Sequence, residues 1–146
     1  MTTKADTSLC NLISTQEFYS VVKAPVGSLH ADIGTVSGFQ EVNCTYKPPS
    51  LPGAGGAITY LFTNDGAAYF AKVQLGDQSV YNSETVVSGI GDAAFWGTQQ
   101  GAPDAFELNM RKGNVVINIL MDGSASDGSA YLSGAEQIAQ EIAAHL

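Results

Sequence analysis

The sequence predicts an α+β domain: an antiparallel β-sheet with helices packed mainly on one face, and with helices near the amino and carboxyl ends. Three observations lead to this prediction. Several short segments alternate apolar and polar residues with the period of two that is typical of strands. Two amphipathic segments with a helical period lie near the chain ends. The order of the elements lacks the regular strand and helix alternation of parallel folds.

The first helix is predicted from Ser14 to about Lys23. Ser14 is a favourable N-cap, and Glu17, three residues later, completes the capping-box pattern in which the two residues exchange hydrogen bonds with exposed backbone donors. Pro25 and Gly27 are expected to stop the helix. His30 and Asp32 then fall in a predicted loop.

The first strands are predicted over residues 34–46 and 57–63. In the earlier segment Val42, Cys44 and Tyr46 alternate with polar residues, so Cys44 is expected to face the core. The intervening residues 47–56 are rich in proline and glycine and are expected to form a flexible loop.

A second helix is predicted after Asp65, because an apolar stripe from Ala67 to Leu75 fits a helical period better than alternation. A loop over residues 76–83 follows it. Two short strands are then expected at residues 84–87 and 93–97.

A β-hairpin is predicted around a turn at residues 112–114. The residues expected to face the core are Phe106, Leu108, Met110, Val115, Ile117, Ile119 and Met121, with Val116, Asn118 and Leu120 on the other side. A loop over residues 122–128 is expected to lead to a terminal helix, capped by Asp127 or Ser133. Its apolar face comprises Ala135, Ile138, Ala139, Ile142 and Leu146.

Composition narrows the class of protein. The 146 residues suit one domain over residues 1–146, with residues 1–8 disordered, and 45% are hydrophobic. No apolar run reaches the roughly 18 residues that a membrane-spanning helix needs. The net charge of −8 and the scattered basic residues argue against a nucleic-acid partner.

Two glycine-rich motifs resemble cofactor or metal loops. Residues 89–94 match the pattern G-x-G-x-x-A, but strand residues follow where a dinucleotide site needs a helix, so we interpret the motif as a tight turn. Residues 122–128 faintly resemble a calcium loop but lack its middle carboxylates and closing glutamate. We therefore expect no cofactor and no metal.

Site residues are few. The aromatic residues either line a ligand pocket between sheet and helix or simply form the core; they are Tyr60, Phe62, Tyr69, Phe95 and Trp96. The alternative is a hydrolase in which His30 and Asp32 activate a serine, although no G-x-S-x-G motif is present. His145, one residue from the carboxyl end, is expected to face solvent.

Cys10 and Cys44 are the two cysteines of the chain. Composition alone leaves two buried thiols and one disulfide open, but a chain rich in Gly, Ser, Thr and Asn is typical of exported domains and favours the bridge. Such a bridge would contribute roughly 3 to 4 kcal/mol. Residues 1–8 have no signal-peptide pattern, so we interpret Met1 as a start after a removed export signal, with a native cytosolic start as the alternative.

Five patterns resemble those of small exported or lipid-anchored bacterial domains of unknown function: residues 9–17, 42–46, 87–96, 111–114 and the terminal helix. The resemblance implies export, the Cys10 to Cys44 bridge and an α+β sandwich. It implies no catalytic residues, and the cysteine that carries lipid in such proteins has no counterpart in this sequence.

The first functional hypothesis is an exported cell-envelope domain that binds a small apolar ligand or an envelope protein without catalysis. The hydrolase using His30 and Asp32 is the rival enzymatic hypothesis. The third is a purely structural envelope protein.

Overall fold

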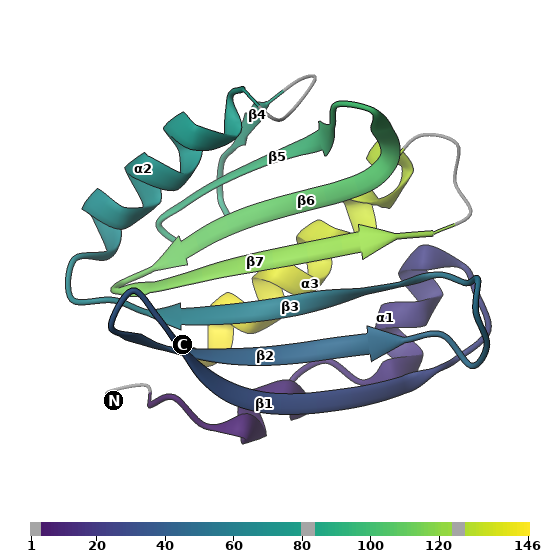
Figure 1. Ribbon diagram of the computed structural model, residues 1–146. Coiled ribbons are helices and arrows are strands. Elements are labelled where there is room, and N and C mark those ends of the chain that lie inside the picture. The colour runs from purple at the N-terminus through teal and green to yellow at the C-terminus, as the bar shows by residue number, and fades with distance from the viewer. Residues whose placement is uncertain (1–3, 80–83, 124–127) are drawn as a thin grey trace.

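The fold is a seven-stranded antiparallel sheet with the strand order β1-β2-β3-β7-β6-β5-β4, as seen in the computed structural model (Figure 1). The structure describes residues 4–79, 84–123 and 128–146. The strands are β1 Ser28–Val36, β2 Phe39–Lys47, β3 Gly55–Phe62, β4 Thr85–Val87, β5 Ala93–Gln99, β6 Ala102–Lys112 and β7 Val115–Asp122. The predicted α+β class is confirmed.

The helices lie mainly on one face of the sheet. They are η1 Thr7–Asn11, α1 Thr15–Val22, α2 Gly66–Asp77, η2 Gly128–Tyr131 and α3 Leu132–His145. Figure 1 shows α1 and α3 behind the sheet and α2 in front of one corner. We call the surface under α1 and α3 the helix-covered face and the opposite surface the open face.

The main core lies between the sheet and the helices α1 and α3. All the inward residues predicted for the hairpin are buried there, and the terminal helix buries Ala135, Ile138, Ala139 and Ile142 as expected. Phe18 of α1 stacks on Tyr46 with ring centroids 4.0 Å apart. Gly56 makes this close packing possible, because a Cβ there would meet the Leu120 carbonyl oxygen and the Phe18 ring.

The amino-terminal segment is tied to the sheet. Cys10 and Cys44 form a disulfide with their Cα atoms 5.3 Å apart, and both are buried. The Tyr46 hydroxyl donates a hydrogen bond to the Ile13 carbonyl at 2.7 Å. Of residues 1–8, for which disorder is predicted, residues 1–3 lie outside the described residues, Ala5 is buried and the Asp6 side chain caps η1.

The predicted strand over residues 34–46 is instead a hairpin of β1 and β2. Its turn is Ser37-Gly38, where both residues have positive φ, as two-residue hairpin turns require. The strand β1 escaped prediction because it lies at the edge of the sheet and has no fully buried residue, so its alternation is weak. His30 and Asp32 therefore lie on a strand and not in the predicted loop.

Caps and helix faces match the predictions in part. Ser14 accepts a hydrogen bond from the Glu17 N–H, as predicted, and Asp65 caps α2 through the Ala68 N–H. In α2 only Gly66 and Phe70 are fully buried, so the predicted stripe is narrower than expected. Ser133 lies inside α3 and does not cap it, whereas Asp127 is outside the described residues.

The glycine-rich motifs adopt turn and strand conformations. Gly89 and Gly91 have positive φ in the turn between β4 and β5, which confirms the tight-turn interpretation. Residues 55 and 56 belong to β3, so the predicted flexible loop ends earlier than expected. Most of the weak calcium-loop match, residues 124–127, lies outside the described residues.

Candidate functional site

A row of polar residues crosses the open face of the sheet. The register aligns Asp32, Asn43, Thr59, Asn118 and Asn109 on the consecutive strands β1, β2, β3, β7 and β6. Directly opposed residues of antiparallel strands point to the same face, so these side chains form one continuous line. We call it the polar row.

At the β2 end, the polar row is linked to Glu41. The Asn43 amide donates to Glu41 Oε1 at 2.9 Å, and the Thr59 hydroxyl donates to Asn43 Oδ1 at 3.2 Å. These bonds fix one carboxylate oxygen of Glu41. The other oxygen, Oε2, accepts no hydrogen bond from the residues that the structure describes.

At the β6 end, the polar row is linked to Glu107. Asn118 Nδ2 donates to Glu107 Oε2 at 3.1 Å and to Asn109 Oδ1 at 3.0 Å. Gln99 Nε2 donates to the other carboxylate oxygen at 3.3 Å. An ionised carboxylate only accepts, so Glu107 sets the orientation of the Asn118 amide, which in turn sets that of Asn109.

Asn109 is left with a buried donor. Its side chain is only 2% exposed, and Nδ2 has no hydrogen-bond partner among the described residues. Leaving such a group unpaired costs roughly 1 to 3 kcal/mol. An apolar residue at this position would avoid that cost.

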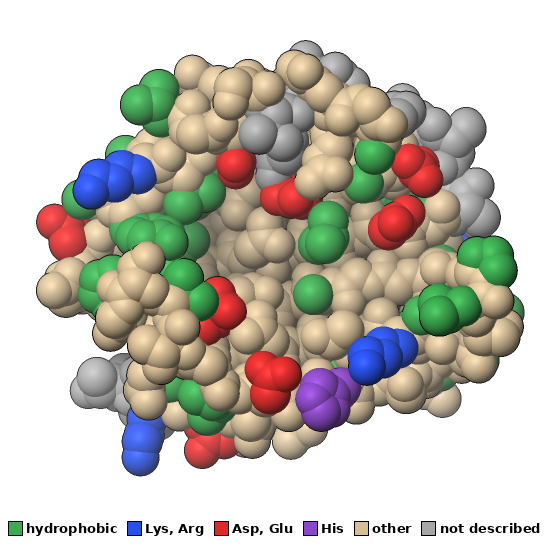
Figure 2. Space-filling model, in the orientation of Figure 1, with side chains coloured by type: hydrophobic (Ala, Val, Ile, Leu, Met, Phe, Trp, Pro, Cys, Tyr) green, Lys and Arg blue, Asp and Glu red, His purple; other side chains and the backbone are tan. Residues whose placement is uncertain are grey.

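A cavity of about 220 Å³ lies between the polar row and α2. Its lining residues are Glu41, Thr59, Leu61, Tyr69, Val73, Asp77, Glu107, Asn109, Val116 and Asn118. Figure 2 shows the corresponding hollow in the open face, with acidic side chains around it. The cavity thus combines an apolar wall with a polar, acidic wall.

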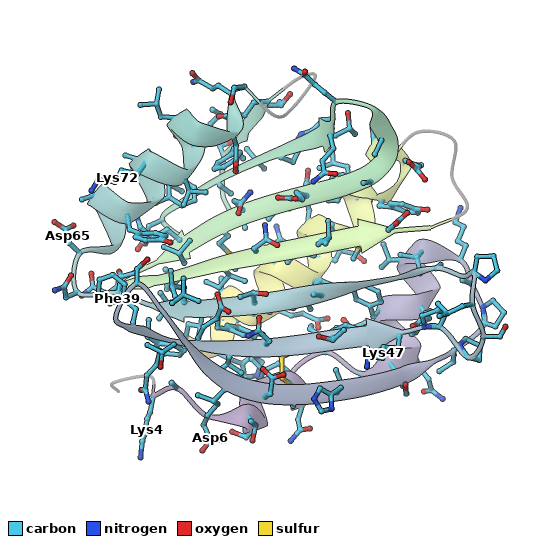
Figure 3. All side chains as sticks on the ribbon, in the orientation of Figure 1. Lys4, Asp6, Phe39, Lys47, Asp65 and Lys72 are labelled. Atoms are coloured by element: carbon cyan, nitrogen blue, oxygen red, sulfur yellow. A yellow bond between two sulfur atoms is a disulfide. The ribbon has the colours of Figure 1, made fainter. Side chains whose placement is uncertain are left out.

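Basic side chains are absent from this lining. Figure 3 shows Lys47 at the far end of β2 and Lys72 on the outer side of α2. Phe39 contacts Tyr69 edge to face, with centroids 6.2 Å apart, and so holds the ring that lines the cavity. Three carboxylates, those of Glu41, Asp77 and Glu107, therefore dominate the electrostatics of the cavity.

The structure does not gather the five aromatic residues predicted to bind a ligand. Tyr69 lines the cavity, and Phe95 is buried in a small cluster beneath α2. The other three belong to the main core on the opposite face: Tyr60 is buried there, Phe62 packs against it, and Trp96 stacks on Phe106 with centroids 5.7 Å apart.

His30 and Asp32 lie on the edge strand. Their side chains are 63% and 54% exposed, and His30 Nε2 is 3.6 Å from Asp32 Oδ2. Neither serine nor threonine hydroxyls in the described ranges hydrogen-bond to His30. Among the residues that the structure describes, no hydroxyl is therefore positioned for activation by His30.

We did not predict the polar row, or the glutamates linked to it, from the sequence. The signal was present on the predicted hairpin, where Glu107, Asn109 and Asn118 occupy the positions that face away from the main core. Three large polar residues facing one another on the outer side of a hairpin indicate either a solvated face or a site. The position of α2 over this face, which the sequence did not predict, encloses the polar residues in a cavity.

The described residues offer neither a metal site nor a membrane-spanning helix. Within the described residues, no three His, Cys, Asp or Glu side chains are grouped to hold a metal ion. No described helix combines the length and apolar character needed to cross a membrane. Comparisons with protein-family models, curated proteins and solved structures give no match to this chain.

Proposed function

We propose that the domain is a binding module for a small organic cation: an ammonium or guanidinium group attached to a short apolar chain. The observation that carries the proposal is the cavity itself, which is lined by three carboxylates and no basic side chain. A cation of this kind matches the acidic wall, while its chain matches Leu61, Val73 and Val116. A purely apolar ligand, the sequence-based hypothesis, would displace water from Glu41 Oε2 without supplying a donor in its place.

Glu41 is the residue proposed to anchor the cation. Its Oε1 is held by Asn43, and its Oε2 is free to accept a charged N–H donor. Both oxygens of Glu107 already accept amide hydrogen bonds, so Glu107 organises the polar row. Tyr69 offers an aromatic ring, and rings attract cations within roughly 6 Å of their centroid.

The test is calorimetric titration of the protein with hexylamine, hexanol and hexanoate, which share a chain and differ in charge. We expect the amine to bind most tightly and the carboxylate not to bind. Glu41→Gln removes the charge at nearly constant shape and is expected to weaken amine binding by roughly tenfold or more, since hydrogen bonds to charged groups contribute about 1.5 to 3 kcal/mol. Glu136→Gln, on α3 and away from the cavity, is the matched control.

Equal affinity for the amine and the alcohol would reject a charge-based site. Binding of a neutral sugar in preference to the amine would replace the proposal by carbohydrate recognition. Unchanged amine binding in Glu41→Gln would place the cation elsewhere.

We also propose that the protein works outside the reducing cytosol, in the cell envelope or secreted. The Cys10–Cys44 disulfide supports this, because such bonds persist in oxidising compartments. The test is fractionation of the native host followed by alkylation of free thiols under denaturing conditions. Recovery in the cytosol with two free thiols would reject the proposal.

A further inference from the structure

The two edges of the sheet differ in length and protection. The strand β4 is three residues long, whereas β1 has nine residues and, in the part of the chain that the structure describes, pairs with β2 alone. Exposed edges are usually protected by lysine, proline or a bulge. The sequence of β1 contains no lysine or proline, and its pairing with β2 continues without a bulge.

Apolar side chains are exposed on this edge. Ile33 and Val36 of β1 are 46% and 38% exposed, and Val26 just before the strand is also exposed. Figure 1 shows β1 along the lower edge of the sheet, with η1 projecting below part of the strand and the chain that follows η1 passing behind it. An edge of this length with exposed β-branched residues is suited to accept another strand.

We propose that β1 pairs antiparallel with β1 of a second copy of the chain, about a two-fold axis at Ala31. In this register Ala31 faces its own counterpart, His30 faces Asp32 of the second copy, and Leu29 faces Ile33 of the second copy. The strand is chemically self-complementary about Ala31, which is the condition for an isologous interface. The inference is independent of the ligand of the cavity.

The faces of the sheet agree with this register. Leu29 and Ile33 are paired with Tyr46 and Val42 of β2, which point to the helix-covered face. His30 and Asp32 are on the open face, at the end of the polar row. A two-fold axis perpendicular to the sheet keeps each face on its own side, so apolar meets apolar and His30 meets a carboxylate.

Neighbouring registers are less favourable. An axis at Asp32 would place Asp32 opposite Asp32 of the second copy, and an axis at His30 would place the two imidazoles opposite each other. Like charges directly opposed across antiparallel strands are destabilising. Alternating His30 and Asp32 from the two copies instead gives a four-residue cluster in which each imidazole faces a carboxylate.

The test is sedimentation velocity of the protein over concentrations from about 1 to about 100 μM, the range of weak homodimers. We expect a dimer at the upper concentrations. His30→Asp gathers four carboxylates at the axis and is expected to raise the dimer dissociation constant by roughly tenfold or more. The double variant His30→Asp with Asp32→His reverses the pair and is expected to restore the dimer.

Both positions are more than half exposed, so thermal unfolding of each variant is expected to match that of the parent protein. Val86→Asp on the opposite edge strand β4 is the matched control and is expected to dimerise normally. A monomer at every concentration overturns the proposal. So does a dimer that survives His30→Asp, that is lost in Val86→Asp, or that the double variant does not restore.

Discussion

Successive residues of β7 alternate between two environments. Ile117 and Ile119 are buried on the helix-covered face, where α1 and α3 pack against the sheet. Asn118 and Leu120 lie on the open face and are partly buried, Asn118 within the polar row. Both sets of residues belong to one strand. The difference between the two faces of the sheet therefore comes from the elements that cover each face.

The two faces therefore contribute differently to the molecule. On the helix-covered face each apolar side chain removes surface from water and stabilises the fold. On the open face the polar row holds its carboxylates by hydrogen bonds, and Asn109 carries an unpaired buried donor. The main core lies on the helix-covered face, whereas the open face holds a smaller apolar cluster and the proposed binding cavity.

The largest expected effect is on the free energy of unfolding, and it is seen by substituting two neighbouring residues of β7. Ile119→Ala leaves a cavity in the main core and is expected to lower the free energy of unfolding by about 4 kcal/mol, whereas Leu120→Ala, partly exposed on the open face, is expected to cost about 1 kcal/mol. Denaturant unfolding monitored by circular dichroism measures both. Similar losses would contradict the contrast between the faces.

The disulfide lies on the helix-covered face. Replacing Cys10 and Cys44 together by alanine is expected to lower the free energy of unfolding by roughly 3 kcal/mol, because the bridge restricts the unfolded chain over a separation of 34 residues. The folded fraction is expected to keep its ligand affinity, since neither residue lines the cavity. A parallel loss of affinity at low temperature would show that the two faces are coupled.

Periodicity predicted those elements whose side chains have one buried face. The hairpin of β6 and β7 is an example, because its inward positions from Phe106 to Met121 are uniformly apolar. Periodicity did not predict β1, because this edge strand has no fully buried residue. As a result, His30 was wrongly predicted to lie in a loop. Local chemistry likewise predicted the Ser14 and Asp65 caps.

The candidate site was not predictable from local patterns. Glu41, Thr59 and Asn118 come from three strands distant in sequence, and only the register β2-β3-β7 brings them together. The aromatic residues were a poor guide, because alternation places Tyr60 on the helix-covered face and Phe95 on the open face. Aromatic content indicates burial but not which face of a sheet buries the ring.

Asn109 offers a test of what an unpaired buried donor costs. Asn109→Leu removes this donor and fills a buried position, at the loss of the hydrogen bond from Asn118 to Asn109 Oδ1, so the free energy of unfolding is expected to rise by about 1 kcal/mol. Asn43→Leu is the control. It breaks the hydrogen bonds of Asn43 with Glu41 and Thr59 and is expected to lower the free energy of unfolding. A destabilised Asn109→Leu would indicate that the amide has a structural role.

The smallest expected effect is a pH dependence of the helix-covered face. Burial raises the pKa of Glu17 to about 7, and the neighbouring Glu141 carboxyl on α3 adds to the shift through a hydrogen bond and repulsion. The ordinary value is 4.5, so between pH 4.5 and 7 the folded state binds more protons than the unfolded state. The contribution of Glu17 to stability is therefore fully present below pH 4.5 and is lost as the pH rises through 7.

Because Glu17 is partly exposed, solvent screening reduces this loss to roughly 1 kcal/mol or less. Glu17→Gln keeps the shape and removes the titration, so the variant is expected to be more stable than the parent at pH 8 and nearly equal to it at pH 4.5. Denaturant midpoints at the two pH values, with Glu136→Gln as the control on the same helix as Glu141, measure the difference. An equal gain in stability of Glu17→Gln at both pH values would assign the effect to helix propensity. A loss of stability at pH 8 would contradict the expected destabilisation by the ionised Glu17 beside Glu141.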